Sequence, residues 1–249
     1  MSSLIKKLSS LSTKSKSSSA SSNTNIGTPA SAAPAPAAPV KMSKIAVIVF
    51  SLYGHVAQLA TQIEAGAKEA GAATVDVYQI EETLSEQVLA KMHANKEPIK
   101  NYPVITPEKL VEYDGFIFGF PTRYGRAPAQ VSAFFDKTGG LWASGALIGK
   151  FASTFTSTGS QHGGNETTHL TTIPFFVHHG INYVPHGYRS SPDQSNLTEI
   201  HGASAYGPGT IAGGDGSRQP PELDLKIAKA HGKYFTEVVN TYVRGKNPA

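Results

Sequence analysis

An apolar stretch that leads directly into a helical pattern constrains the fold of this chain more than any other feature. Residues 44–50, Lys-Ile-Ala-Val-Ile-Val-Phe, are rich in β-branched side chains, which is typical of a central parallel strand covered on both faces. In residues 57–70, apolar side chains recur every three or four positions, which predicts a helix with one face packed on a sheet. Residues 51–56 therefore form a tight loop between a strand and a helix.

The 51–56 loop has the features of an anion-binding site. At such a connection, the free N–H groups of the first helical turn and the positive end of the helix dipole point beyond the strand. Ser51 adds a hydroxyl donor, and Gly54 allows a positive φ or a close backbone approach. The loop lacks the Gly-Lys-Ser/Thr ending of a Walker loop and the three spaced glycines of a dinucleotide fingerprint. Binding of a nucleoside triphosphate and Rossmann-type binding of NAD are therefore both weakened as interpretations. The alternative is an ordinary strand-to-helix loop, common in α/β proteins.

Two further predicted strands, residues 113–120 and residues 151–156, end in loops rich in hydrogen-bond donors. Ligands of open α/β sheets bind outside the carboxyl ends of the strands, where the strand order reverses. We therefore expect both loops to lie beside the 51–56 loop and to complete a site with three walls. The residues expected in these two walls are Pro121, Thr122, Arg123, Tyr124, Gly125, Ser157, Thr158, Gly159, Ser160, Gln161 and His162.

Several segments, in order from about residue 43 to about residue 244, resemble one known family. They are Ser-Leu-Tyr-Gly-His at 51–55, Gly-Phe-Pro-Thr-Arg at 119–123, Thr-Gly-Gly-Leu-Trp-Ala-Ser-Gly-Ala-Leu at 138–147, Ser-Thr-Gly at 157–159, His-His-Gly at 178–180 and Thr-Ile-Ala-Gly-Gly-Asp-Gly-Ser-Arg-Gln-Pro at 210–220. Together they resemble the flavodoxin-like NAD(P)H:quinone oxidoreductases of the tryptophan-repressor-binding-protein type, the type IV quinone reductases. We expect the relatives to be fungal.

The resemblance implies an α/β fold of the flavodoxin-like, doubly wound type. The expected domain covers residues 43–249, with a five-stranded parallel sheet in the order 2-1-3-4-5. The remaining strands are expected at residues 73–80 and around Thr210. Helices are expected at residues 85–93, at 129–137, from Glu166 to before His178, and at 222–244. Residues 187–209 form a long segment before the last strand, and loops of such length are usually functional or form interfaces.

The resemblance also implies FMN as the cofactor, with NADH or NADPH as the electron donor. The FMN phosphate would lie on Ser51 and on the amides of the next five residues, and the ring would lie between the two donor-rich loops. Amides near the ring would stabilise the anionic reduced flavin. The residues expected to bind the cofactor in the first loop are Ser51, Leu52, Tyr53, Gly54, His55 and Val56.

Two further residues match family positions beside the flavin, Trp142 and His178. Trp142 matches an aromatic residue that lines the substrate cavity from a neighbouring subunit, and His178 matches a histidine that contacts the ring and can donate a proton to the quinone oxygen. Tyr53 matches a residue that contacts the nicotinamide dinucleotide. Taken alone, Trp142 would be a core or interface aromatic and His178 a helix-end histidine, while Arg123 would fit a salt bridge equally well.

The function implied by the resemblance is two-electron reduction of quinones to hydroquinones by a ping-pong cycle, with protection against oxidative stress. The implied assembly is a homo-oligomer, a dimer or a tetramer. Two alternatives stay open. One is a one-electron carrier of the flavodoxin type, although such carriers are usually strongly acidic. The other is a structural or regulatory flavodoxin-like protein associated with a membrane.

Composition limits the other chemistries. The chain has no cysteine, which excludes disulfides, thiolate nucleophiles and cysteine-based metal sites. Its histidines lack carboxylates at supporting spacing, so we expect no metal, and it has no Gly-x-Ser-x-Gly motif for a hydrolase. Lysines before Ser43 contribute +5 to the formal net charge of +4. The remainder is close to neutral, and no nucleic-acid partner is expected.

The first 42 residues change from Ser- and Lys-rich to Ala- and Pro-rich sequence, which predicts a disordered tail. Leu4, Ile5, Leu8 and Leu11 nevertheless recur at helical spacing among lysines, so weak contact with a membrane surface is one interpretation. A mitochondrial transit peptide is another, although the tail lacks arginine. The expected location is cytoplasmic, with peripheral contact at the plasma membrane as the alternative.

Overall fold

The computed structural model of this protein describes residues 41–246. The predicted tail, apart from its last two residues, lies outside the described residues, and so do the membrane-surface and transit-peptide interpretations of it. None of the helices in the described range is long and apolar enough to span a membrane.

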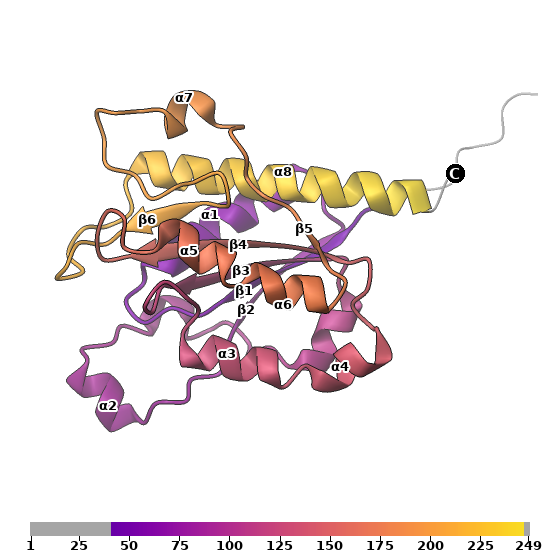
Figure 1. Ribbon diagram of the computed structural model, residues 1–249, viewed down its shortest axis with the longest axis horizontal. Helices are drawn as coiled ribbons and strands as arrows, with labels where there is room; N and C mark the ends of the chain where they lie inside the picture. Colours follow the sequence, from indigo (N-terminus) through magenta and orange to yellow (C-terminus); the bar gives the residue numbers. More distant parts are fainter. Residues whose placement is uncertain (1–40, 247–249) are drawn as a thin grey trace, which may run out of the picture. The chain divides into compact units, whose positions relative to one another are not determined.

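A parallel sheet forms the centre of the fold. Its strands are β1 (Lys44–Val49), β2 (Thr74–Gln79), β3 (Gly115–Pro121), β4 (Phe151–Thr158) and β5 (Asn182–Tyr183). They pair in the order β2-β1-β3-β4-β5 (Figure 1), which confirms the predicted order. The apolar residues of β1 and all of β4 are buried, as expected for central strands covered on both faces.

The last strand, β6 (Gly209–Ile211), is the one predicted around Thr210, whereas the two-residue β5 is a sixth strand that the prediction of five lacks. The strand β6 pairs with the carboxyl-terminal half of β4, whereas β5 pairs only with Phe151 and Ala152 at the other half. Two short strands therefore share one edge of β4, and residues 184–208 run between them. We refer to these residues as the 184–208 insertion.

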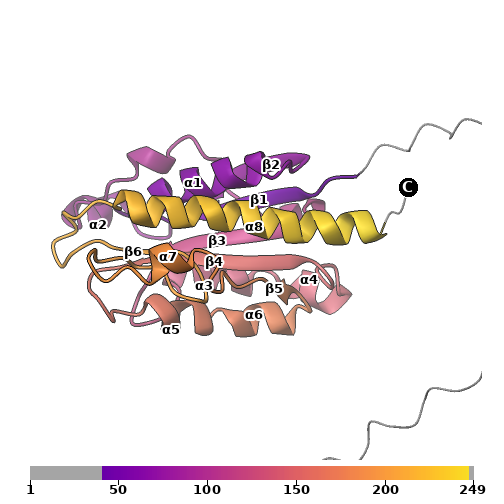
Figure 2. The same cartoon turned by 90° about the horizontal axis from the view of Figure 1, so that it is seen from above.

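Helices cover both faces of the sheet (Figure 2). On one face, α1 (His55–Glu69) packs against the long α8 (Glu222–Lys246). The approach is close, because a Cβ on Gly66 would lie 2.0 Å from the carbonyl oxygen of Lys229. On the other face lie α3 (Ala129–Asp136), α4 (Gly139–Ser144), α5 (Asn165–Leu170) and α6 (Ile173–His178). The remaining short helices are α2 (Glu86–Lys91), α7 (Ser191–Gln194) and the 3-10 helices η1 (Glu97–Ile99) and η2 (Pro107–Glu112).

The predicted helix from Glu166 to His178 is wrong as a single helix. The structure divides it into α5 and α6, with a break at Thr171 and Thr172. Pro174 explains the break, because proline has no N–H and its ring would clash with the carbonyl of Leu170 in a continuous helix. Pro174 stands instead in the first turn of α6, where it is tolerated.

The 184–208 insertion is held against α8 by three contacts of its first half. The guanidinium of Arg189 lies 3.3 Å from the centre of the Tyr234 ring. Asp193 pairs with Lys226 at 3.0 Å, and Nδ1 of His186 lies 3.3 Å from Nδ1 of His231. The insertion is therefore fixed on the edge of the sheet, next to the carboxyl end of β4.

Candidate functional site

The 51–56 loop begins at the end of β1 and presents backbone N–H groups at the start of α1. Gly54 has φ of 89°, and its carbonyl accepts the first helical hydrogen bond, from the N–H of Gln58 at 3.1 Å. The N–H groups of His55, Val56 and Ala57 have no carbonyl acceptor within the helix, and they point out of its amino end. Ser51 is buried, and its hydroxyl oxygen accepts from the N–H of Gly54 at 3.1 Å. This arrangement can bind an anion through amides and the helix dipole.

The side chains of this loop divide into two groups. Leu52, His55 and Val56 are 3%, 5% and 1% exposed, so only their backbone is free to contact a ligand. Tyr53 is 42% exposed, and its hydroxyl donates to the carbonyl of Met92 at 3.3 Å. The predicted anion cradle is therefore a backbone feature, and Tyr53 is the one large side chain directed outward.

The loop after β3 makes a tight turn at residues 123–126. Arg123 and Arg126 exchange two backbone hydrogen bonds, of 2.8 and 3.1 Å, and the central residues Tyr124 and Gly125 have φ of 56° and 75°. A two-residue turn with both centres at positive φ has the type I′ pattern. Tyr124 is fully exposed at its tip. A bulky residue in this conformation is uncommon and often marks a functional position.

The strand β4 ends at Thr158, two residues beyond the predicted end at residue 156, so the loop that follows it begins at Gly159. Ser157 and Thr158 are buried strand residues, because they pair with Pro121 of β3 and with Thr210 and Ile211 of β6. Long-range pairing therefore extends the strand by two residues. The backbone carbonyl of Ser157 accepts from the N–H of Thr122 at 2.9 Å, so the ends of β3 and β4 remain tied together.

These two loops and the 184–208 insertion enclose a cavity of about 650 Å3, which we call the loop cavity. Of the predicted site residues, it brings together Tyr124, Gly125, Gln161 and His162. His162 has φ of 59°, a second non-glycine residue in the left-handed region. The remaining lining residues are Gly163, Gly164, Asn165, Glu166, Thr167, His201, Ala203, Ser204 and Ile211.

The sequence interpretation missed the residues that the insertion contributes to this cavity. His201 lines it, and its Nδ1 is buried with no hydrogen-bond partner within the part of the chain that the structure describes. The backbone N–H of its neighbour Gly202 donates to the buried carboxylate of Asp224 at 3.1 Å. Arg218 donates to the carbonyls of Ile200 and Ile211. The only sequence signal for a functional role of the 184–208 insertion was its length.

The lining of the loop cavity includes the acidic Glu166, and it does not include Arg123 of the loop after β3. Arg123 donates to the carbonyl of Thr122 at 2.8 Å and forms no ion pair with any residue in the range 41–246. The salt-bridge interpretation of Arg123 is therefore wrong for this part of the chain. The positive charge of Arg123 is therefore available to an anionic ligand.

Trp142 and His178 lie elsewhere. Both line a shallow pocket of about 460 Å3 with Val177 and Ile148, and the N–H of Gly149 donates to the carbonyl of Gly180 at its base. Gly149 precedes β4, so this pocket lies at the amino end of the strand. At about 3.3 Å per residue, the eight residues of β4 separate it from the loop cavity by roughly 23 Å. In both views, α4 lies at the end of the sheet opposite β6 (Figures 1 and 2).

Within one chain His178 does not lie beside the other predicted site residues, and the prediction that Trp142 serves a neighbouring subunit stays a prediction. The reason is topological, since α4 and the end of α6 lead into the amino ends of β4 and β5. His179, next in sequence, is buried and its Nε2 lies 2.9 Å from the hydroxyl oxygen of Thr138. Burial and the neighbouring His178 lower the pKa of His179, so it is a structural histidine.

Two other histidines, His169 of α5 and His231 of α8, are buried against opposite faces of the sheet and do not line the loop cavity. Nδ1 of His169 lies 2.6 Å from the hydroxyl of Thr154, and burial lowers the pKa of His169 to about 3. Nε2 of His231 lies 2.7 Å from the hydroxyl of Ser153. Among the described residues, no group of three or more His, Asp or Glu side chains is placed to hold a metal ion.

The fold and the site define a flavodoxin-like α/β protein whose first strand-to-helix loop presents free amides that can bind an anion. The family described as NADPH-dependent FMN reductase matches residues 43–195, which is more than half of the chain. The chain is 52% identical to "NAD(P)H quinone oxidoreductase PST3" of Candida albicans, over 79% of this chain and 98% of that protein. It is 51% identical to "Quinone-oxidoreductase QR2" of Triphysaria versicolor, over 79% of this chain and 95% of that protein. The chain therefore belongs to the NADPH-dependent FMN reductase family.

Solved structures agree on the fold. The flavodoxin-like, WrbA-like protein from Agrobacterium tumefaciens superposes with a TM-score of 0.56 at 22% identity, covering 80% of this chain and 98% of that one. An archaeal flavodoxin gives a TM-score of 0.51 at 17% identity, over 79% of this chain and 98% of that one. These similarities support the fold alone.

Proposed function

We propose that this protein binds FMN and uses NADH or NADPH to reduce quinones to hydroquinones by two-electron transfer. The 51–56 loop carries this proposal, because its amides form an anion cradle at the same sheet edge as the loop cavity. Family membership and the relatives named as quinone oxidoreductases support it.

The described residues fit FMN in three respects. Amides and the Ser51 hydroxyl can hold the phosphate without a lysine. The strained turn at Tyr124 and the loop of residues 159–164 form walls of a cavity large enough for a planar ring system. Arg123, which forms no ion pair within the described range, carries a positive charge on the loop after β3. Bound FMN supplies the acceptor and donor of the hydride.

The residues of the chain would orient the reactants and exclude water. Tyr124, at the exposed tip of its turn, is placed to cover a ligand in the loop cavity. The buried and unpartnered Nδ1 of His201 is free to form a hydrogen bond with a substrate oxygen there. Backbone N–H groups after β4 stabilise negative charge as it develops in the site.

A second copy of the chain would complete the site. Trp142, Ile148 and Val177 are 59%, 69% and 66% exposed and line one pocket, and exposed apolar patches of this kind commonly mark protein interfaces. Within one chain this patch lies far from the loop cavity. We propose a dimer or tetramer in which Trp142 and His178 reach the loop cavity of a neighbouring subunit, where His178 donates a proton to the quinone oxygen.

The experiment combines absorbance and kinetics. The purified protein should be yellow or become so with FMN, and should oxidise NADH or NADPH with benzoquinone in parallel-line, ping-pong kinetics. Reductive titration should pass directly from the oxidised to the fully reduced spectrum. A long-wavelength band at the midpoint would instead favour the one-electron carrier. Colourless protein that sediments with lipid vesicles would favour the structural or regulatory alternative.

We also propose that the protein protects against oxidative stress and that it is cytoplasmic. Its tail would make weak peripheral contact with the plasma membrane. The tail contact is supported by charge alone, since the lysines of the first 42 residues carry the excess positive charge. Full-length protein with Lys6→Gln and Lys7→Gln should lose binding to anionic vesicles if the contact exists. Equal binding by both proteins would contradict it.

A further inference from the structure

His201 belongs to the wall that the 184–208 insertion contributes to the loop cavity. It lies in neither a strand nor a helix, so no regular backbone ladder holds it. Its Nδ1 is buried and has no hydrogen-bond partner among residues 41–246. The place of this imidazole in the wall therefore depends on how the backbone on either side of it is held.

The backbone of Gly202, the residue after His201, is bound on both sides. Its N–H donates to Oδ1 of Asp224 at 3.1 Å, and its carbonyl accepts from Nδ2 of Asn165 at 2.5 Å. A Cβ at this position would lie 2.5 Å from the backbone nitrogen of Thr210, so Gly202 rests directly on β6. These contacts leave His201 little freedom on its carboxyl side.

The backbone on the amino side of His201 is bound by Arg218. Its guanidinium donates to the carbonyl of Ile200 at 2.5 Å and to that of Ile211 at 2.6 Å. Since Ile211 is the last residue of β6, this side chain ties the insertion to the strand. His201 therefore stands between two backbone groups that are both bound by charged side chains.

Asp224 is a buried carboxylate outside the loop cavity. It is 0% exposed, lies in the first turn of α8 and does not line the cavity. Burial raises the pKa of this carboxyl, while the hydrogen bond from Gly202 and the positive charge of Arg218 act in the opposite direction. Burying a carboxylate is costly unless it is hydrogen-bonded, and this one accepts its bond from the residue that follows His201. Asp224 is therefore placed to control the wall of the cavity.

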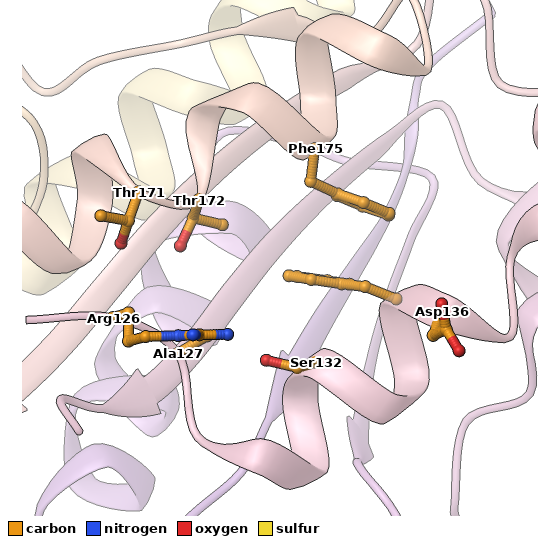
Figure 3. A pocket seen from close by; sticks show the side chains of 8 residues that line it. Arg126, Ala127, Ser132, Asp136, Thr171, Thr172 and Phe175 are labelled. Carbon is orange, nitrogen blue, oxygen red and sulfur yellow. The ribbon is translucent and has the colours of Figure 1, made fainter. Parts of the chain in front are cut away.

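The helix that supplies Asn165 is firmly packed. Asn165 is the first residue of α5, and Figure 3 shows Thr171 and Phe175, which follow this helix, facing α3 across a groove of about 510 Å3. The ring of Phe175 stacks on that of Phe135 of α3, with 3.9 Å between the ring centres. The bond from Asn165 to Gly202 thus starts from a rigid base, as does the bond to Asp224 from α8.

We propose that Asp224 is a positioning residue of the loop cavity, which acts through Gly202 to hold His201 where it binds an oxygen of the substrate. This inference rests on the proposed function and deepens it, because it gives the 184–208 insertion a part in substrate binding. Without the carboxylate, the buried N–H of Gly202 has no acceptor, which is unfavourable. Movement of Gly202 toward water relieves this and carries His201 away from the cavity.

A double-mutant cycle on the FMN-loaded protein tests the coupling. Asp224→Ala removes the acceptor, and kcat/KM for benzoquinone should fall about tenfold. His201→Ala should lower it by a similar factor. The double variant should be no slower than His201→Ala alone, because Asp224 acts through His201. Effects that multiply in the double variant would show that Asp224 acts independently of His201 and would overturn the inference.

A conservative variant and a second readout separate positioning from a general loss of structure. Asp224→Asn keeps an oxygen acceptor for the N–H of Gly202 and should retain most of the wild-type kcat/KM. Hydrogen–deuterium exchange, read by mass spectrometry, should be faster at residues 198–204 in Asp224→Ala and unchanged in Asp224→Asn. The matched control is Asp193→Ala, since Asp193 joins the first half of the insertion to Lys226 of α8 at 3.0 Å. It should match the wild type in both measurements.

The outcomes separate this inference from the proposed function. Wild-type exchange in Asp224→Ala would show that Gly202 keeps its place without the carboxylate, and faster exchange with an unchanged kcat/KM would show that His201 does not bind the substrate. Either result overturns the inference and leaves quinone reduction intact. If Asp224→Ala does not fold, an Asp224→Asn protein as slow as His201→Ala would overturn it as well. Failure of the wild type to bind FMN or to turn over quinone would instead remove the proposed function.

Discussion

The N–H of Thr122 donates to the carbonyl oxygen of Ser157 at 2.9 Å, and this bond ties the loop after β3 to the end of β4. The side chain of Thr122 extends the same connection. Its oxygen accepts from the N–H of Gly125 at 3.1 Å and from the hydroxyl of Thr168 at 2.8 Å. Thr122 thus fixes the strained turn at Tyr124 relative to the loop that follows β4.

Replacing Thr122 by valine should loosen this turn. The variant keeps the side-chain shape but removes the acceptor for two donors, at a cost of about 1 kcal/mol for each lost bond. We expect FMN affinity to fall several-fold in a fluorescence titration. Thr241→Val is the matched control, because Thr241 donates only to its own helix α8. Equal FMN affinity in Thr122→Val and the wild type would show that the turn does not contact the cofactor.

Gly54→Ala should weaken the anion cradle. Gly54 has φ of 89°, and an added Cβ would also lie 3.4 Å from a side-chain carbon of Pro98. A left-handed alanine costs about 1–2 kcal/mol, and relief of that strain would displace the amides at the start of α1. We expect FMN affinity to fall about tenfold with little change in helix content. Gly245→Ala, with open space and no positive φ, should bind FMN normally.

Trp142→Ala should slow quinone turnover and leave FMN bound. Trp142 lies far from the loop cavity in its own chain, so we expect its effect to depend on the assembly. A fall in kcat/KM for benzoquinone of about tenfold, with an unchanged flavin spectrum, is the expected result. Leu197→Ala, also highly exposed, serves as the control. Loss of flavin from Trp142→Ala would place this residue at the cofactor and contradict the proposed role.

Stability should fall with acid below about pH 6.5. Burial lowers the pKa of His169 to about 3 and of His186 to about 4, and lowers that of His231 as well. Since unfolded histidines have pKa values near 6.5, the unfolded state binds more protons below that pH. The free energy of unfolding therefore decreases toward acid by at most about 1.4 kcal/mol per pH unit for each histidine.

Urea denaturation at several pH values between 7 and 5 checks this dependence. His169→Gln should lower the free energy of unfolding at pH 7 and flatten its pH dependence by about one proton. His93→Asn, at an exposed histidine, should keep the wild-type slope. A wild-type free energy of unfolding that is constant from pH 7 to pH 5 would show that these histidines are not buried in the neutral form.

Local patterns in the sequence predicted much of the fold. The β-branched run of β1 and the helical period of α1 are properties of neighbouring residues, so they locate the 51–56 loop from the sequence alone. The break at Thr171 and Thr172 depends on Pro174. This proline is also a local signal, but the prediction of one continuous helix gave more weight to the helical spacing of the apolar residues around it. The last helix was also predicted nearly to its bounds, from residues 222–244 to the observed Glu222–Lys246.

Features that depend on distant contacts could not be predicted in the same way. Ser157 and Thr158 are strand residues only because Pro121 and β6 lie beside them. His201 reaches the loop cavity through the contacts of Gly202 with Asp224 and of Ile200 with Arg218. Family resemblance pointed to Trp142 and His178, but no local pattern shows that the pocket they line lies at the amino end of β4, away from the loop cavity.

Absorbance titration of the purified protein with FMN tests the central claim most directly. The amide cradle at residues 51–56 predicts a saturable yellow complex with one FMN per chain, retained on dialysis and weakened in Gly54→Ala. Protein that remains colourless in saturating FMN, or that binds it equally well with Gly54 replaced, would contradict the assignment of this loop as the phosphate site.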